Sequence, residues 1–166
     1  MRPFDALVVD EAAKCLGKPY IWGANGDMCW VAKDKPPQST VQFANCVEAY
    51  DCVGLVKMAI KRAGGPDLRW THNAQTLYDK LPMKMTGEDE TAFRLRFYGP
   101  SDKAVAHVSL ELARDERLFL IQAAGGDQGT VTFAEAMRRH AFVMEGHTER
   151  ADFLGVRSLV ACQLLK

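Results

Sequence analysis

The sequence predicts an α+β fold, with helices in the first half of the chain and a small antiparallel sheet in the second. Up to about residue 81, apolar residues recur at helical spacing; from residue 92, short runs rich in β-branched and aromatic residues follow one another. With 166 residues, 48% of them hydrophobic, the chain suits a single domain, 1–166, with a proper core and room for one insertion.

Residues 4–16 are the first predicted helix, since their apolar side chains fall on one stripe at helical spacing. Gly17 and Pro19 follow as a stop signal. Residues 24–50 show little periodicity and hold several prolines and hydroxyl residues, so we expect an insertion there. A loop of that length is uncommon in a compact domain and is often functional.

The next helix has the clearest pattern in the chain, with apolar residues from Cys52 to Ala63 at i, i+3, i+4, i+7, i+8 and i+11. We place Lys57 and other cations on its outer face and at its C-terminal end. A Gly-Gly-Pro sequence ends it. Thr71 is the predicted N-cap of a short helix through about Leu81.

Three consecutive antiparallel strands are predicted from FRLRFYG (93–99), VAHVSLEL (105–112) and RLFLIQAA (117–124). Asp115 and Glu116 mark the turn between the second and the third. A capping-box pattern over 132–135 predicts one more short helix, ending near His140. The tail FLGVRSLVACQLL (153–165) offers one or two further strands.

Composition excludes several classes of function. Lys+Arg and Asp+Glu are both 21 and no basic stripe is visible, so nucleic acid is not an expected partner. No apolar run approaches the roughly 20 residues of a membrane helix. The N-terminus lacks the pattern of a secretory signal, so we expect a protein that is cytoplasmic at synthesis, or exported by a route that the sequence does not show.

Five cysteines are present, and none lies in a C-x-x-C pair, so no structural zinc or other metal site is predicted. Their odd number leaves at least one free thiol. Cys29 and Cys46 share one polar stretch and could pair, although a reducing cytosol would keep that pair open.

Cys52 lies at the predicted start of an amphipathic helix, directly after Asp51, which can cap that helix. Unpaired backbone N–H groups and the positive end of the helix dipole favour a thiolate there, so we expect a lowered thiol pKa. The same N–H groups could receive an oxyanion. The alternative is a core cysteine on the apolar stripe, a common place for this residue.

A cysteine nucleophile needs a base, and His107 lies on a predicted strand, a rigid mount for one. The alternative is a half-buried histidine on a sheet face. Of the other histidines, His72 lies at a helix start where the dipole disfavours imidazolium, and His140 and His147 are expected in solvent.

Gln122 is the one polar side chain in the middle of the following strand, and its amide oxygen can accept a hydrogen bond from the far ring nitrogen of His107. The separation of 15 residues allows an antiparallel hairpin to bring the two together. The alternative is an edge-strand glutamine that faces water. Cysteine, histidine and a polar residue follow in the order of papain-type enzymes.

The stretches CLGKPYIWGANG, YDCVGLV, FYGPSDKAVAHVSLEL and LIQAAGG resemble, in that order, the landmarks of the NlpC family of papain-like cell-wall cysteine peptidases. The resemblance covers most of residues 12–126. FYG, the glycine pair of AAGGD and ADFLG look most like the phage- and prophage-encoded branch. The resemblance implies a papain-like domain in which the helix that begins with the nucleophile packs on a small antiparallel sheet.

The resemblance also implies roles for single residues: Cys52 as nucleophile, His107 as base and Gln122 as the group that orients the base. It places Tyr20 beside the nucleophile, where it helps to shape the oxyanion site. Asp51 belongs to the same candidate oxyanion and substrate-binding group.

Two further candidate substrate-binding positions depart from the family pattern. Val53 stands where the family usually has a serine that helps to bind the amine end of the substrate. Trp70 stands where an arginine often lies, and Arg69 could replace that arginine in a shifted register. Gln122 itself stands where histidine is usual.

The implied activity is cleavage of peptidoglycan stem peptides, next to D-glutamate and typically at its bond to the diamino acid, without metal or organic cofactor. Two rivals remain: an amidase that acts on a different wall bond, and an assembly or wall-binding module that has kept the fold without turnover. We expect no further domain for wall targeting, so a phage tail or lysis apparatus is a possible partner.

The insertion over 24–50 is expected to wall the substrate cleft, because PYIWG precedes it and Asp51 follows it. Trp30 and Phe43 could give that wall an apolar surface.

Overall fold

The computed structural model describes residues 3–29, 38–39, 48–82, 93–114, 117–124, 142–146 and 150–166. Its helices and strands in chain order are α1 (Phe4–Ala13), β1 (Asn25–Gly26), β2 (Met28–Cys29), β3 (Gln38–Ser39), β4 (Ala49–Tyr50), α3 (Cys52–Arg62), α4 (Ala74–Lys80), β5 (Arg94–Tyr98), β6 (His107–Arg114), β7 (Arg117–Ala124), β8 (Phe142–Gly146), β9 (Phe153–Ser158) and the 3₁₀-helix η1 (Val160–Leu164).

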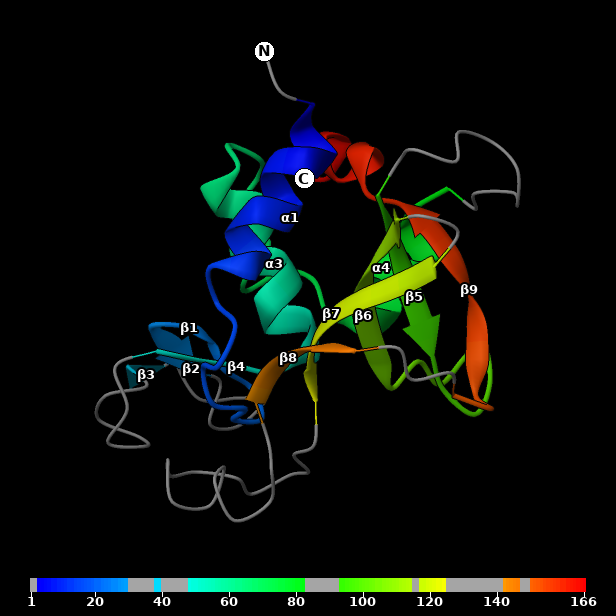
Figure 1. The fold of residues 1–166 in the computed structure, drawn as a ribbon, viewed down its shortest axis with the longest axis horizontal. Helices are drawn as coiled ribbons and strands as arrows, with labels where there is room; N and C mark the ends of the chain where they lie inside the picture. The colour runs from blue at the N-terminus through cyan, green and yellow to red at the C-terminus, as the bar shows by residue number, and fades with distance from the viewer. Residues whose placement is uncertain are drawn as a thin grey trace.

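Five strands form one antiparallel sheet in the order β8-β7-β6-β5-β9. Two small two-stranded sheets, β1–β4 and β2–β3, lie near the start of α3, at the opposite end of the molecule from the N-terminus (Figure 1). Helices thus precede the main sheet, and the predicted α+β class is confirmed, as are the three consecutive antiparallel strands.

The core lies between the sheet and the helices. Helix α1 packs along α3, and α3 packs on β6 and β7 (Figure 1). Side chains alternate between the faces of each strand, so Leu95, Val108 and Leu110 point into one hydrophobic cluster with α1 and α3. The neighbouring positions His107 and Gln122 are buried and polar.

Helix α3 forms as its periodicity predicts. The Asp51 side chain accepts a hydrogen bond from the Gly54 N–H and so caps the first turn. Leu55, Val56 and Ile60 are fully buried. The helix ends at Arg62, just before Gly64, which adopts the left-handed conformation with φ of 90°.

Three details differ from the sequence-based expectation. Asn73, not Thr71, caps α4, because the Asn73 side chain accepts from the Thr76 N–H at 2.8 Å. The tail gives one strand, β9, followed by a 3₁₀-helix instead of a second strand. Lys57 is buried, with only 4% of its surface exposed, and does not lie on the outer face of α3.

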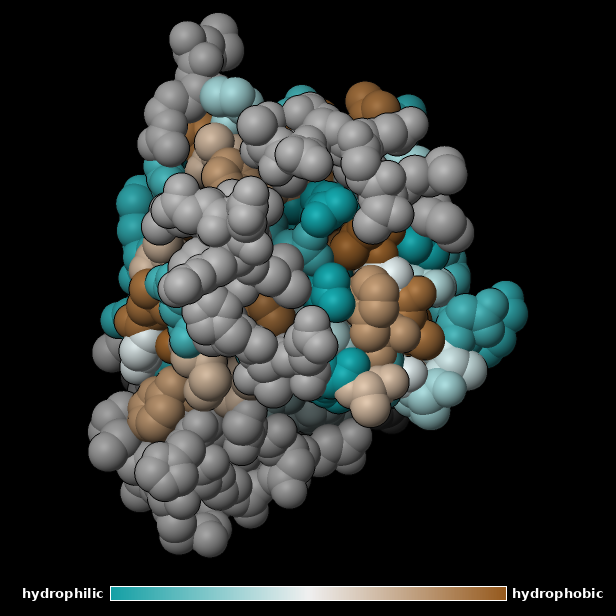
Figure 2. Space-filling model, turned by 45° about the vertical axis from the view of Figure 1, so that its right-hand side comes forward, coloured by the Kyte–Doolittle hydropathy of each residue, from teal (hydrophilic) through white to brown (hydrophobic). Residues whose placement is uncertain are grey.

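Several expectations concern residues outside the described ranges: the helix over 132–140, the turn at Asp115–Glu116, the pairing of Cys46, and the wall residues Trp30 and Phe43. They stay predictions. Figure 2 shows one face of the molecule, on which small hydrophilic and hydrophobic areas of the described residues lie side by side.

Candidate active site

A cleft of about 890 Å³ opens at the N-terminal end of α3. Its walls come from four segments: residues 20–25, the first turns of α3 with Asp51, the loop and first turn of α4 over 69–75, and the two residues before β6. The candidates Tyr20, Asp51, Cys52, Val53 and Trp70, which are scattered through the first half of the sequence, all line it.

Asp51 fastens the loop over 20–24 to the start of α3. Its two carboxylate oxygens accept separate hydrogen bonds, from the Gly54 N–H at 2.6 Å and from the Gly23 N–H at 2.9 Å. The Asp51 N–H donates to the Ala24 carbonyl at 3.0 Å. Burial raises the pKa of the Asp51 carboxyl, while Lys57 and the donated N–H bonds act in the opposite direction. Asp51 therefore positions the nucleophile's helix, and its oxygens are engaged within the protein.

Gly54 permits the close contact between this loop and α3. A Cβ atom at Gly54 would lie 1.9 Å from the Ala24 carbonyl oxygen, a distance that no side chain can occupy. The glycine two residues after Cys52 is thus a packing requirement of the site.

Cys52 is a free, largely buried thiol at the first residue of α3. Burial raises its thiol pKa to about 12, and the Asp51 charge adds to this effect. The backbone N–H groups of Val108, Val53 and Cys52 itself lower the pKa, as expected at a helix start, but they do not outweigh burial. The predicted fall in the Cys52 pKa is therefore wrong for this resting structure.

The N–H of Val108 acts on the Cys52 sulfur, so the start of β6 lies against the start of α3. His107, the first residue of β6, is the neighbour of Val108 in the chain. The main chain at the start of β6 thus meets the start of α3, although 54 residues of sequence separate Cys52 from His107. Val105 and Ala106, just before His107, line the cleft, whereas His107 and Gln122 are not among its lining residues.

The predicted hydrogen bond between His107 and Gln122 is present: Nε2 of His107 and Oε1 of Gln122 are 2.7 Å apart. An amide oxygen only accepts, so Nε2 carries the proton and Nδ1 keeps its lone pair for another partner. Gln122 lies in β7, an inner strand of the sheet, and is 5% exposed. The alternative of a glutamine facing water at a sheet edge is excluded.

Burial lowers the pKa of His107 to about 4; Arg150 acts in the same direction, and the Gln122 hydrogen bond opposes it. His107 is thus a neutral imidazole at neutral pH, and Nδ1 can accept a proton.

The remaining candidates shape the cleft walls. Tyr20 is buried and bridges to Tyr50, directly before Asp51. Val53 gives an apolar wall where the resemblance implies a hydroxyl. The Arg69 guanidinium lies 5.6 Å from the Trp70 ring centre and binds both carboxylate oxygens of Asp67 at 2.8 Å.

Lys57 and His72 are among the cleft residues that the sequence did not predict to take part. Lys57 follows Val53 by one helical turn, and this four-residue spacing is the signal that would have placed it on the cleft side. His72 also lines the cleft, with Nδ1 2.7 Å from Thr71 Oγ1 and Nε2 3.5 Å from Lys80 Nζ. Both of its ring nitrogens have partners, which makes it a poor base.

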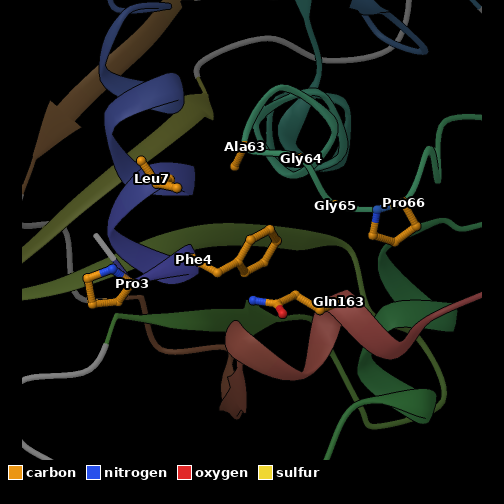
Figure 3. Close-up of a pocket in the computed structure, with 8 residues that line it drawn as sticks. All are labelled: Pro3, Phe4, Leu7, Ala63, Gly64, Gly65, Pro66 and Gln163. Carbon is orange, nitrogen blue, oxygen red and sulfur yellow. The ribbon is translucent and has the colours of Figure 1, made fainter. Parts of the chain in front are cut away.

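A second cavity, of about 790 Å³, lies at the other end of α3 (Figure 3). Phe4 and Leu7 of α1, residues 63–66 after α3 and Gln163 of η1 line it, and the Phe4 ring points into the space between them. None of its lining side chains is titratable or nucleophilic. The described residues also contain no group of three or more side chains suited to a metal ion, and no helix among them is long and apolar enough to cross a membrane.

Several solved structures share this fold. The P60 domain of antigen MAP1204 from M. avium subspecies paratuberculosis matches with a TM-score of 0.62 at 17% identity, over 95% of each chain. RipD from Mycobacterium tuberculosis, described as a non-catalytic NlpC/p60 domain protein adapted to peptidoglycan binding, matches with 0.60 at 16% identity, over 94% of this chain and 96% of that one.

The peptidoglycan hydrolase RipB from Mycobacterium tuberculosis matches with a TM-score of 0.58 at 19% identity, over 94% of this chain and 64% of RipB. No protein-family model and no curated protein sequence matches the chain. The order of its helices and strands, and its likeness to these structures over nearly its whole length, show that the chain has the α+β, papain-like fold of NlpC/P60 domains.

Proposed function

We propose that this protein is a cysteine peptidase that hydrolyses peptidoglycan stem peptides, with Cys52 as nucleophile and His107 as base. The observation that carries the proposal is the 2.7 Å hydrogen bond from His107 Nε2 to Gln122, since it fixes the ring and its tautomer with Nδ1 able to accept a proton.

In the first half of the reaction, the Cys52 thiol transfers its proton to His107 Nδ1 and the sulfur attacks the scissile carbonyl carbon. Negative charge then develops on the carbonyl oxygen. The N–H groups at the start of α3 can stabilise it, with Tyr20 beside them. His107 gives its proton to the leaving amine, and the C–N bond breaks.

In the second half, a water molecule gives a proton to His107 and attacks the thioester. The C–S bond breaks, the acid product leaves, and the sulfur recovers its proton. Because burial favours the neutral thiol and the neutral imidazole at rest, we expect proton transfer to accompany substrate binding, when the substrate excludes water and the developing charges stabilise each other.

The finer proposal is cleavage next to D-glutamate at its bond to the diamino acid, as the resemblance implies. The protein would be made in the cytoplasm and reach the wall after release or delivery, with a phage tail or lysis apparatus as partner. The likeness to RipB supports the wall as the place of action.

The alternative is a wall-binding module without turnover, and the raised Cys52 pKa together with the likeness to RipD favours it. Incubation of purified peptidoglycan with the wild type and with Cys52→Ala, followed by mass spectrometry, decides between the two. We expect new muropeptides cut within the stem from the wild type alone. Intact stems released from the glycan would indicate an amidase, and binding without new fragments a binding module.

A further inference from the structure

Lys57 is an unusual residue for its place. It lies in the middle of α3, lines the cleft that contains Cys52, and is only 4% exposed. A lysine is almost never buried so deeply without partners that offset the loss of hydration. Its surroundings therefore show what it does.

Its first partners are main-chain oxygens of the opposite cleft wall. The Lys57 ammonium donates to the carbonyl of Arg69 at 3.0 Å and to the carbonyl of His72 at 2.9 Å. These carbonyls bracket Trp70, a wall residue of the cleft. Lys57 thus ties the wall over 69–72 to the helix that starts with Cys52.

Its second partners are charges. Burial lowers the pKa of Lys57, and Arg69 acts in the same direction, while Asp51 and an ionised Cys52, at the start of the same helix, oppose that shift. Asp67 also faces Lys57 but forms its own pair with Arg69, and Lys80 faces the ring of His72.

The charges at the start of α3 need a counter-charge. When Cys52 ionises, two negative groups, the thiolate and the Asp51 carboxylate, adjoin in the sequence and are shielded from water. His107 is neutral at rest and becomes positive only after it has taken the proton. Among the described residues of α3, Lys57 is the buried basic side chain that lines the cleft.

We propose that Lys57 is a positioning residue of the site: its buried ammonium offsets the charge of Asp51 and so allows Cys52 to ionise, while its hydrogen bonds hold the Arg69–His72 wall in place. This inference rests on Cys52 as the nucleophile of the proposed function. It also accounts for a buried lysine whose sequence position indicates a solvent-exposed face.

The test separates the charge from the hydrogen bonds. Lys57→Gln keeps N–H donors and removes the charge, whereas Lys57→Met removes both. The matched controls are Lys61→Gln and Lys61→Met, since Lys61 lies on the same helix but is exposed and pairs with Asp67 at 3.3 Å. The readout is the rate of Cys52 alkylation by iodoacetamide against pH, followed by peptide mapping.

In both Lys57 variants we expect Cys52 alkylation about tenfold slower at each pH below its midpoint, which corresponds to a thiol pKa higher by about one unit. The Lys61 variants should match the wild type. A Lys57→Gln protein with the wild-type profile would overturn the proposal, because the charge would then have no role. If Lys57→Met does not fold, the comparison of Lys57→Gln with Lys61→Gln decides.

Alkylation does not depend on the natural substrate, so the two proposals fail separately. A wild type that leaves peptidoglycan intact, together with slower alkylation in the Lys57 variants, would refute the peptidase and retain the counter-charge. If the wild type cleaves peptidoglycan and Lys57→Gln is alkylated at the wild-type rate, the peptidase is retained and the counter-charge role of Lys57 is refuted.

Discussion

The two ends of α3 carry cavities of similar size and opposite chemistry. The N-terminal cleft of about 890 Å³ gathers a thiol, a buried ammonium and a carboxylate, with the start of β6 at its edge. The C-terminal cavity of about 790 Å³ is lined by apolar side chains, glycines and one glutamine (Figure 3). Volume alone does not distinguish them; titratable groups and the positive end of the helix dipole do.

The difference also shows how the site is built. At the N-terminal end, the Asp51 carboxylate accepts hydrogen bonds from the N–H groups of Gly23 and Gly54 and so links the loop over 20–24 to α3. The absence of a side chain at Gly54 allows the close contact between them. At the C-terminal end, Gly64 has open space around its Cα. Gly65, next to it, is closely packed against Ile60 and Phe4. Gly54 is tightly constrained and Gly64 is not, so the same substitution at these two positions should have unequal effects.

The largest contrast should come from His107→Ala against Gln163→Ala. Loss of a positioned general base costs a factor of about 10² to 10⁴ in rate, so His107→Ala should lose nearly all peptidoglycan cleavage. Gln163→Ala changes the other cavity and should leave the rate within twofold. Release of muropeptides over time measures both. A fully active His107→Ala enzyme would show that another residue is the base, and His72, which lines the cleft, would be tested next in spite of its two ring partners.

Acid should destabilise the folded protein through His107, whose pKa is lowered by burial. The pKa of His107 is about 4 in the folded protein and about 6.5 in the unfolded chain, so between these pH values the unfolded chain binds a proton that the folded one does not. The His107 contribution is therefore intact above pH 6.5, and about 3 kcal/mol of stability is lost as the pH falls to 4.

Urea unfolding of the wild type and of His107→Asn at pH 7.5 and pH 4.5 measures the stability that is lost through His107. The carboxylates and the other histidines titrate in both proteins, so their effect cancels in the comparison. The wild type should lose more stability than the variant over that interval. Equal losses would mean that the imidazole is more hydrated than its 7% exposure indicates.

Two glycine substitutions compare the packing of the two ends. Gly54→Ala places a methyl group against the Ala24 carbonyl and should cost about 3 kcal/mol, since main chain must move. Gly64→Ala meets no atom within 4 Å and costs only the strain of a left-handed alanine, about 1 kcal/mol. Thermal unfolding of the two variants tests the order, and a reversed order would contradict the tight contact at the cleft.

The sequence predicted what depends on local pattern and spacing. Periodicity identified α3, and short runs rich in β-branched and aromatic residues identified β6 and β7. The separation of 15 residues correctly predicted the contact between Gln122 and His107. The Cys52 pKa could not be predicted in this way, because the helix start favours the thiolate locally while burial, a property of the whole fold, favours the thiol.

Lys57 shows the same limit. Cations on a helix usually face solvent, and nothing near Lys57 in the sequence shows that the chain over 69–72 returns to cover it. The cap of α4 is a smaller example, since Thr71 and Asn73 are both good N-caps and only the geometry selects Asn73. The position of Lys57 depends on contacts between segments, whereas the cap of α4 is a choice between two nearby residues.

The smallest effect is expected from Gln122, the hydrogen-bond partner of the proposed base. Gln122 touches the base and not the reacting atoms, so Gln122→Ala should lower the cleavage rate about tenfold, a loss of about 1.4 kcal/mol in transition-state stabilisation. The hydrogen bond raises the His107 pKa, so its removal should lower that pKa further and move the acid limb of the rate profile to lower pH. Gln122→Asn, which keeps the amide on a shorter side chain, is the matched control and should recover part of the rate. A loss as large as that of His107→Ala would show that Gln122 contributes to the oxyanion site as well as to the orientation of the ring.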